Sequence, residues 1–190
     1  MRSAILALAP LMLSASLSAQ GVFSNKTQVI LEKVIQDYPN HFTNIKGELI
    51  SQALQTSRYK STLELPGASS STVTLVTTTG TEGSGWTCTV LHTADFEQAR
   101  TRFSEIYGQL SNSIISAAGQ KTFILSGQYE NPTPDKKANE VIFTLLPGVG
   151  EMKRIRVELT LRGDAQDWIV TISVNDGDPR QQAQLAVNGK

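Results

Sequence analysis

The sequence predicts an α+β protein of two tandem repeats, each an α-helix followed by four strands, with both helices packed on one face of the antiparallel sheet or sheets. Three observations predict this fold: landmarks that recur in order, runs in which apolar and polar residues alternate, and two helices with an apolar face. The expected repeats are residues 20–94 and 95–175, preceded by a signal peptide and followed by a polar tail, residues 176–190.

The duplication rests on three pairs of landmarks that appear in the same order in both halves. The pairs are Gly47 and Gly127, Leu65-Pro66-Gly67 and Leu146-Pro147-Gly148, and Trp86 and Trp168. Their offset drifts only from 80 to 82 residues, which favours an ancient duplication over chance. If the match is structural, both tryptophans are core anchors.

Residues 1–19 have the organisation of a secretory signal peptide. Arg2 precedes an apolar stretch at residues 4–13, and small residues then lead to Ala19, the expected cleavage site. The apolar stretch is shorter than the roughly 20 residues that span a bilayer. We therefore expect an exported protein, periplasmic or extracellular, with no transmembrane segment once the signal is removed.

The mature chain is close to neutral. The full chain has 17 basic and 17 acidic residues, and the signal removes only Arg2, which leaves a net charge of −1 on 171 residues. Such a chain lacks the basic surface that binds nucleic acid or an anionic membrane. Cys88 is the single cysteine and cannot form an internal disulfide, so the hydrophobic core alone must hold the fold.

In the first half, a helix is expected from about Ser24 to the stop at Pro39. Strands are expected near residues 42–48, 56–65, 71–79 and 85–93, and the last two show clear alternation. Residues 80–85 are rich in glycine and read as a hairpin connection, because no Gly-Lys-Ser/Thr and no helix follow to make a phosphate loop.

The second helix is expected to begin at Asp95, an N-cap with Gln98 completing a capping box. Strands follow near residues 121–129, 139–146, 152–162 and 167–175, with a surface loop at 131–137. The two sets of strands could form one continuous sheet about a pseudo-twofold axis or two adjacent small sheets.

The sheet face opposite the helices is the candidate binding surface. Alternation assigns to it a polar set of threonine and arginine side chains: Thr72, Thr74, Thr87, Thr89, Arg154, Arg156, Thr160 and Arg162. Such a composition is typical of a solvated sheet face and also of a face that binds a protein.

The sequence gives little indication of a catalytic or metal-binding group of side chains. Cys88 and His92 are four residues apart on one strand, about 13 Å, which is too far for a nucleophile and its base. His41, His92 and a carboxylate such as Asp95 could converge on a metal, but no ligand spacing within one element indicates it. We predict no catalytic residue, no metal and no cofactor.

The chain resembles a group of uncharacterised exported proteins from Gram-negative bacteria. The resemblance rests on the segments 44–48 (Asn-Ile-Lys-Gly-Glu), 59–61 (Tyr-Lys-Ser) and 65–68 (Leu-Pro-Gly-Ala), and on Trp86 before Asp95-Phe96 with Trp168 near the end. In outline, the helix-plus-four-strand arrangement is also similar to the secreted β-lactamase inhibitor protein, which binds a partner through a sheet. Neither resemblance supplies a functional residue.

Together these features favour a non-enzymatic exported protein that binds an unknown protein partner or assists envelope assembly. The alternative is a small-molecule-binding protein or a hydrolytic enzyme whose site is assembled from several strands. A deep pocket that holds His41 or His92 beside a carboxylate would favour this alternative.

Overall fold

The computed structural model describes residues 25–78, 81–117, 119, 121–163 and 166–177. The expected signal peptide, residues 1–19, and most of the expected polar tail lie outside these residues, as does part of the glycine-rich connection at 80–85. None of the described helices is long and apolar enough to span a bilayer.

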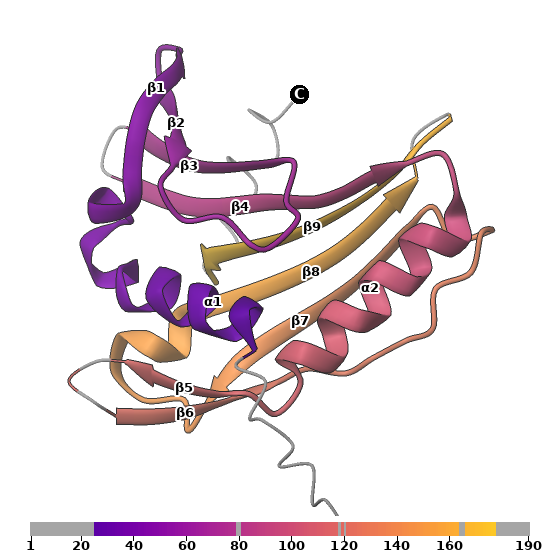
Figure 1. The fold of residues 1–190 in the computed structure, drawn as a ribbon. Coiled ribbons are helices and arrows are strands. Elements are labelled where there is room, and N and C mark those ends of the chain that lie inside the picture. The colour runs from indigo at the N-terminus through magenta and orange to yellow at the C-terminus, as the bar shows by residue number, and fades with distance from the viewer. Residues whose placement is uncertain (1–24, 79–80, 118, 120, 164–165, 178–190) are drawn as a thin grey trace, which may run out of the picture.

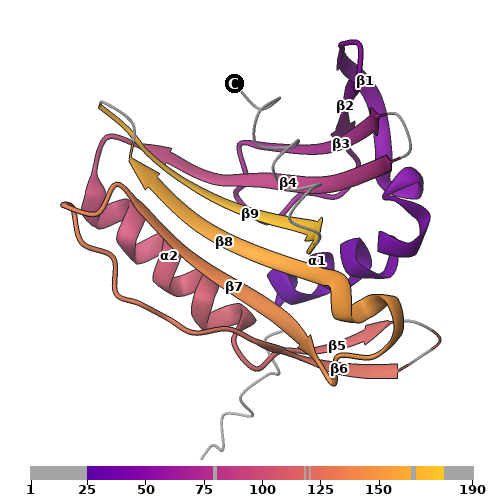
Figure 2. The same ribbon diagram turned by 180° about the vertical axis from the view of Figure 1, so that it is seen from behind.

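The described strands form one antiparallel sheet of nine strands in the order β1-β2-β3-β4-β9-β8-β7-β6-β5. The strands are β1 (Lys46–Gln52), β2 (Thr56–Ser61), β3 (Ser70–Thr78), β4 (Thr81–Thr93), β5 (Ile114–Ala117), β6 (Lys121–Ser126), β7 (Ala138–Leu146), β8 (Ile155–Gly163) and β9 (Trp168–Asp176). Figures 1 and 2 show both helices, α1 (Lys26–Gln36) and α2 (Phe96–Leu110), on the same side of it. The predicted α+β fold is confirmed, with one continuous sheet.

Local capping fixes where each helix begins. The side chain of Asn25 accepts the backbone N–H of Gln28 at 3.1 Å and starts α1. Asp95 accepts the N–H of Gln98 at 3.2 Å and starts α2, as predicted. The capping box is not closed by the Gln98 side chain, because the N–H of Asp95 is bonded to Thr93 Oγ1 at 3.2 Å. Helix α2 therefore has the predicted N-cap without the predicted capping box.

The core lies between the helices and the sheet. It buries the inner face of α1 (Leu31, Val34, Ile35), that of α2 (Ala99, Phe103, Ile106, Leu110) and the alternate residues of the strands. In β7, for example, Val141, Phe143 and Leu145 are buried, and the residues between them face away from the helices. Both helices thus cover one face of the sheet and leave the opposite face to other contacts.

The two tryptophans occupy different places in the sheet. Trp86 lies within β4, opposite Val73 of β3, and is fully buried. Trp168 is the first residue of β9, opposite Gly163, and is only partly buried. The expectation that Trp168 is a core anchor equivalent to Trp86 is therefore wrong. The order of the strands in the sheet nevertheless runs from β1 to β4 and then from β9 back to β6.

Several elements differ from the sequence-based expectation. Strand β5 at the sheet edge was not predicted, and it has no counterpart among β1–β4. The first expected strand, near 42–48, begins only at Lys46, because Thr43–Ile45 forms a 3-10 turn, η2. Likewise β8 begins at Ile155, after the 3-10 helix η3, Gly150–Arg154.

Candidate functional site

Most of the predicted binding residues lie on the sheet face opposite the helices. Thr72 and Thr87 are direct cross-strand neighbours on β3 and β4, and Thr89 faces Thr171 of β9. Thr74 lies two residues along β3 from Thr72 and shares its face. All four predicted threonines of this region are half-buried, so their side chains are crowded but reachable.

Strand β8 supplies the central part of this open face. The hydroxyl groups of Thr160 and Thr171 are 2.6 Å apart across the β8–β9 ladder. Arg156 donates to the carbonyl oxygens of Lys153 and Ile155, both at 3.1 Å, and Arg162 is exposed at the far end of the strand. These contacts bring the predicted threonines and two of the three predicted arginines onto one surface.

Arg154 does not belong to that surface, contrary to the prediction. It is the last residue of η3, and its guanidinium forms a bidentate pair with Asp176, with Nε–Oδ1 at 3.2 Å and Nη2–Oδ2 at 2.5 Å. Asp176 is in phase with the buried Val174 and therefore points to the helix side. Alternation assigned Arg154 to the open face because it assumed that the strand had already begun.

Glu158 is the central charge of the open face. It stands opposite Ile142 on β7 and Ser173 on β9. Burial raises the pKa of its carboxyl above the ordinary value, and the nearby Glu140 adds to the rise, while hydrogen bonds from Ser173 and Asn175 oppose it. The Glu158 carboxylate is therefore partly desolvated and is held on this face by Ser173 and Asn175, which donate to its Oε2 at 3.5 and 3.4 Å.

An apolar patch adjoins this polar region and was not anticipated. Ile114, Ile124 and Leu146 are directly opposite one another on β5, β6 and β7, so the three side chains form one row. Ile142 shares the face of Leu146, four residues earlier on β7, and stands directly opposite Glu158 of β8. These four side chains, 44 to 56% exposed, form what we name the apolar patch. The alternation in 138–146 could have indicated two of its members.

A small polar pocket lies at the end of the sheet where β4 begins and β9 ends. Its volume is about 220 Å³, and its lining includes Tyr38, His41, Ser84, Arg154 and Asp176. The hydroxyl of Tyr38 donates to Asp176 Oδ2 at 2.7 Å. Burial, reinforced by this hydrogen bond to a carboxylate, raises the pKa of Tyr38 well above its usual range.

His41 enters this pocket from a left-handed backbone conformation. Its φ of 53° is followed by a φ of 59° at Phe42, an uncommon succession for residues other than glycine. The Nδ1 atom of His41 is 3.4 Å from Ser84 Oγ, beyond the 2.6–3.2 Å expected for a working nucleophile and base. The pocket therefore meets in part the expectation of a histidine beside a carboxylate, because His41 lines it together with Glu151 and Asp176.

The remaining reactive side chains do not converge. Cys88 is fully buried in the core, and burial raises the pKa of its thiol. His92 lies near the other end of β4, eight residues from Ser84 and so roughly 27 Å from it, where its Nε2 is 3.1 Å from Asp167. Within the described residues, no group of three His, Cys, Asp or Glu side chains is arranged to hold a metal ion.

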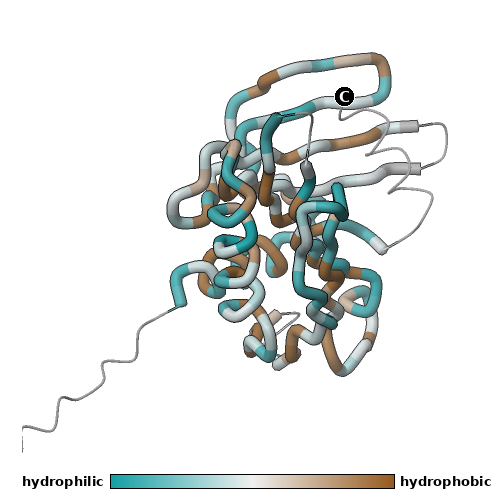
Figure 3. Tube along the Cα trace, turned by 90° about the vertical axis from the view of Figure 1, so that its right-hand side faces the viewer, coloured by the Kyte–Doolittle hydropathy of each residue, from teal (hydrophilic) through white to brown (hydrophobic). Residues whose placement is uncertain are grey.

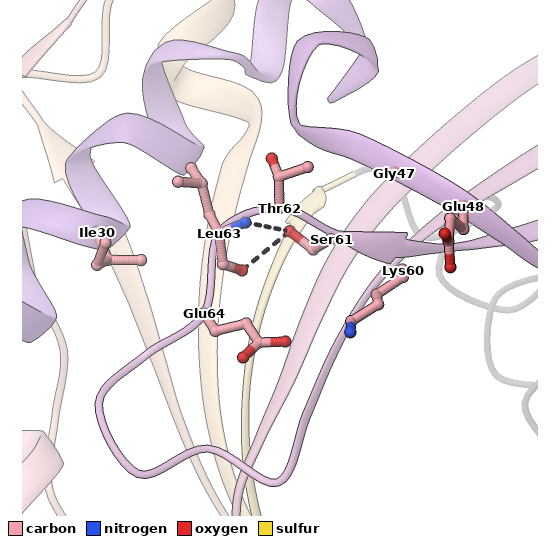
Figure 4. A pocket seen from close by; sticks show the side chains of 8 residues that line it. All are labelled: Ile30, Gly47, Glu48, Lys60, Ser61, Thr62, Leu63 and Glu64. Carbon is pink, nitrogen blue, oxygen red and sulfur yellow. Dashed lines mark hydrogen bonds between the residues drawn. The ribbon is translucent and has the colours of Figure 1, made fainter.

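A larger groove lies at the base of the β1–β2 hairpin. It has a volume of about 630 Å³ and is lined by Ile30, Gly47, Glu48 and residues 60–64. Figure 4 shows Ile30 of α1 on one side of it and Glu48 and Lys60 of the hairpin on the other. Its floor is fixed because Ser61 Oγ donates to Leu63 O at 2.9 Å and accepts the indole N–H of Trp86 at 3.1 Å. Nothing in the sequence pattern indicated this groove.

The chain matches no protein-family model and no curated protein sequence. Among solved structures it is similar to the extracellular domain of PknH from Mycobacterium tuberculosis, with 12% identity and a TM-score of 0.33, over 64% of this chain and 62% of that one. A similarity at that TM-score carries no argument about function. The resemblance to exported proteins of Gram-negative bacteria therefore stays a prediction.

Proposed function

We propose that this chain is a non-enzymatic exported protein that binds another protein, or assists envelope assembly, through the open face of its sheet. The observation that carries the proposal is the apolar patch, Ile114, Ile124, Ile142 and Leu146, on the same sheet face as the threonine and arginine side chains of β3, β4 and β8. A purely solvated sheet face has no reason to expose four large apolar side chains together, whereas a binding face gains from burying them.

The binding surface would combine this patch with the predicted polar residues: Thr72, Thr74, Thr87, Thr89, Arg156, Thr160 and Arg162. Apolar area would supply most of the affinity, and the polar groups around it would orient the partner. Arg154 is not included, because it is engaged with Asp176 at the helix side.

The test is capture from an envelope extract by the tagged mature protein, with two matched variants. Ile124→Lys introduces a charge in the middle of the patch, and Leu54→Lys introduces the same charge at the fully exposed tip of the β1–β2 hairpin. We expect a partner to be captured by the wild type and by Leu54→Lys but lost from Ile124→Lys. If no protein is captured while a metal or metabolite co-purifies in stoichiometric amount, the proposal is wrong.

Export, the signal peptide at residues 1–19 and the duplication of residues 20–94 and 95–175 belong to the same proposal. The order of charge, apolar stretch and small residues supports export. The strand order β1 to β4 beside β9 to β6 supports the duplication, while β5 and the place of Trp168 do not follow from it.

A second candidate function is the binding of a small polar molecule in the His41 pocket. It is favoured by the hydrogen-bonded group of Tyr38, Asp176 and Arg154 beside the strained backbone of His41. A screen of small polar metabolites by thermal shift tests it: a compound that raises the melting temperature of the wild type but not of His41→Ala would favour this function, and its absence would reject it.

A further inference from the structure

The two edges of the sheet are treated differently by the rest of the chain. At β5, α1 covers the edge with side chains one turn apart. Gln28 Nε2 donates to the carbonyl of Ile114 and Gln36 Nε2 to that of Ser116, both at 2.7 Å, and Glu32 Oε1 accepts the N–H of Ser116 at 3.2 Å. Three outward backbone groups of this strand are therefore satisfied by α1, and such a cover is how proteins prevent further strands from adding to an edge.

The opposite edge, β1, has no such cover. Within the described part of the chain, no residue outside β2 forms a hydrogen bond with the backbone of Lys46–Gln52. Leu49 and Ile50 are 51 and 55% exposed in the middle of the strand. The hairpin projects from the body of the molecule (Figure 1), and Figure 3 shows hydrophobic stretches along it, away from the helices. An uncovered edge with apolar residues is a template for a further strand.

We propose that β1 accepts an extended peptide segment of a partner protein by strand addition, with a basic side chain of that segment in the groove beside it. The register of β1 on β2 shifts between Lys46 and Leu49 and again between Leu49 and Ser51. Such bulges increase the local twist of an edge, which obstructs pairing with the preformed edge of a second copy of this chain. A flexible peptide can follow the twist, so a peptide is the better occupant.

The groove defines the chemistry of the side chain that would enter it. Ile30 and Leu63 provide apolar surface for a long stem, and Glu48, Glu64 and Lys60 carry a formal net charge of −1 at its rim. Among the described residues, none of these three charges is engaged in a salt bridge. A lysine or arginine side chain would therefore bury its methylene groups and meet the two carboxylates.

The probe is a fluorescent peptide of sequence Thr-Val-Thr-Val-Lys-Val-Thr-Val-Thr, measured by fluorescence polarisation with the mature protein. We expect it to bind about tenfold more tightly than the same peptide with a central glutamate. A version with two valines replaced by proline should not bind, because proline cannot donate to a ladder. Ile50→Lys should weaken binding about tenfold, Leu54→Lys should not, and Glu64→Gln should reduce the preference for the lysine peptide.

Several results would overturn the inference. They are binding of the proline peptide as tight as that of the lysine peptide, binding unchanged in Ile50→Lys, or no binding up to about 1 mM. A dimer in sedimentation velocity that Ile50→Lys converts to a monomer would replace the peptide by a second copy. The site extends the proposed protein-binding function to a separate surface, and Ile124→Lys should bind the peptide like the wild type. If the wild-type protein captures a partner from the envelope extract but does not bind the peptide, the edge site alone is rejected.

Discussion

Replacement of Trp86 by alanine is the sharpest test of how the core is organised. Trp86 is the largest fully buried side chain and lies in the middle of β4. Truncation to alanine removes the whole indole from a packed environment, and such changes cost about 3–5 kcal/mol of unfolding free energy. Trp86→Phe keeps a ring but removes the N–H that donates to Ser61 Oγ at 3.1 Å, which should cost about 1–2 kcal/mol.

Trp168→Ala is the matched control. Trp168 is partly buried at the start of β9, and its ring meets Phe96 edge to face with centroids 4.8 Å apart. Loss of that pair and of the partial burial should cost about 1–2 kcal/mol. Duplication alone would instead predict equal losses at both tryptophans.

Urea denaturation followed by far-UV circular dichroism measures these differences without relying on tryptophan fluorescence. The slope against urea concentration should be similar in all variants, so that the midpoint reports stability. Equal losses for Trp86→Ala and Trp168→Ala would refute the reasoning, as would a loss below about 1 kcal/mol for Trp86→Ala.

Three further predictions follow from single contacts. Cys88→Val should change the unfolding free energy by less than about 1.5 kcal/mol, and the buried thiol should react with DTNB only after urea unfolds the protein; rapid reaction of the native protein would contradict its burial. Gly127→Ala should lower the unfolding free energy by about 1–3 kcal/mol, because a Cβ there would lie 2.7 Å from the Phe143 ring. A Cβ at Gly108 in α2 meets nothing within 4 Å, so Gly108→Ala should raise the unfolding free energy by about 0.5–1 kcal/mol. Losses of the same size in both variants would count against this packing. The pKa of Tyr38 is raised in the folded state by burial and by Asp176, so its contribution to stability is complete below about pH 10, where the unfolded tyrosine ionises, and is lost as the pH rises further. Tyr38→Phe should therefore lose less unfolding free energy than the wild type as the pH rises above about 10. An identical slope of unfolding free energy against pH would contradict the shift.

Periodicity predicted the elements whose own side chains decide their structure. Helix α2 begins at Asp95 because that side chain caps it, and β7, β8 and β9 have buried residues at every second position. Eight of the nine strands therefore lie near the predicted ranges. The threonines of the open face follow from the same alternation, which assigns the face of a residue as soon as its strand is known.

The features that the sequence did not predict depend on contacts between distant residues. Strand β5 has four residues, too few for a clear alternation, and its edge is bonded to α1 about 80 residues earlier. Arg154 left the predicted face because residues 150–154 turn into a 3-10 helix before β8 begins. The apolar patch needs the order of β5, β6 and β7 in the sheet, and no single strand reveals that order.

The bonds between α1 and β5 have a consequence for how the chain reaches this fold. Asn25 Nδ2 donates to the carbonyl of Gln109 at 2.6 Å, and Gln28 and Gln36 reach residues 114 and 116, so the earliest helix is anchored in the later half. During synthesis α1 must wait for some 80 more residues before its partners exist, a high contact order that slows folding. A fragment that ends before α2 would leave α1 without the strand β5 to which it is bonded. A fragment that begins at α2 would leave β5 as an uncovered edge strand, which is prone to aggregation.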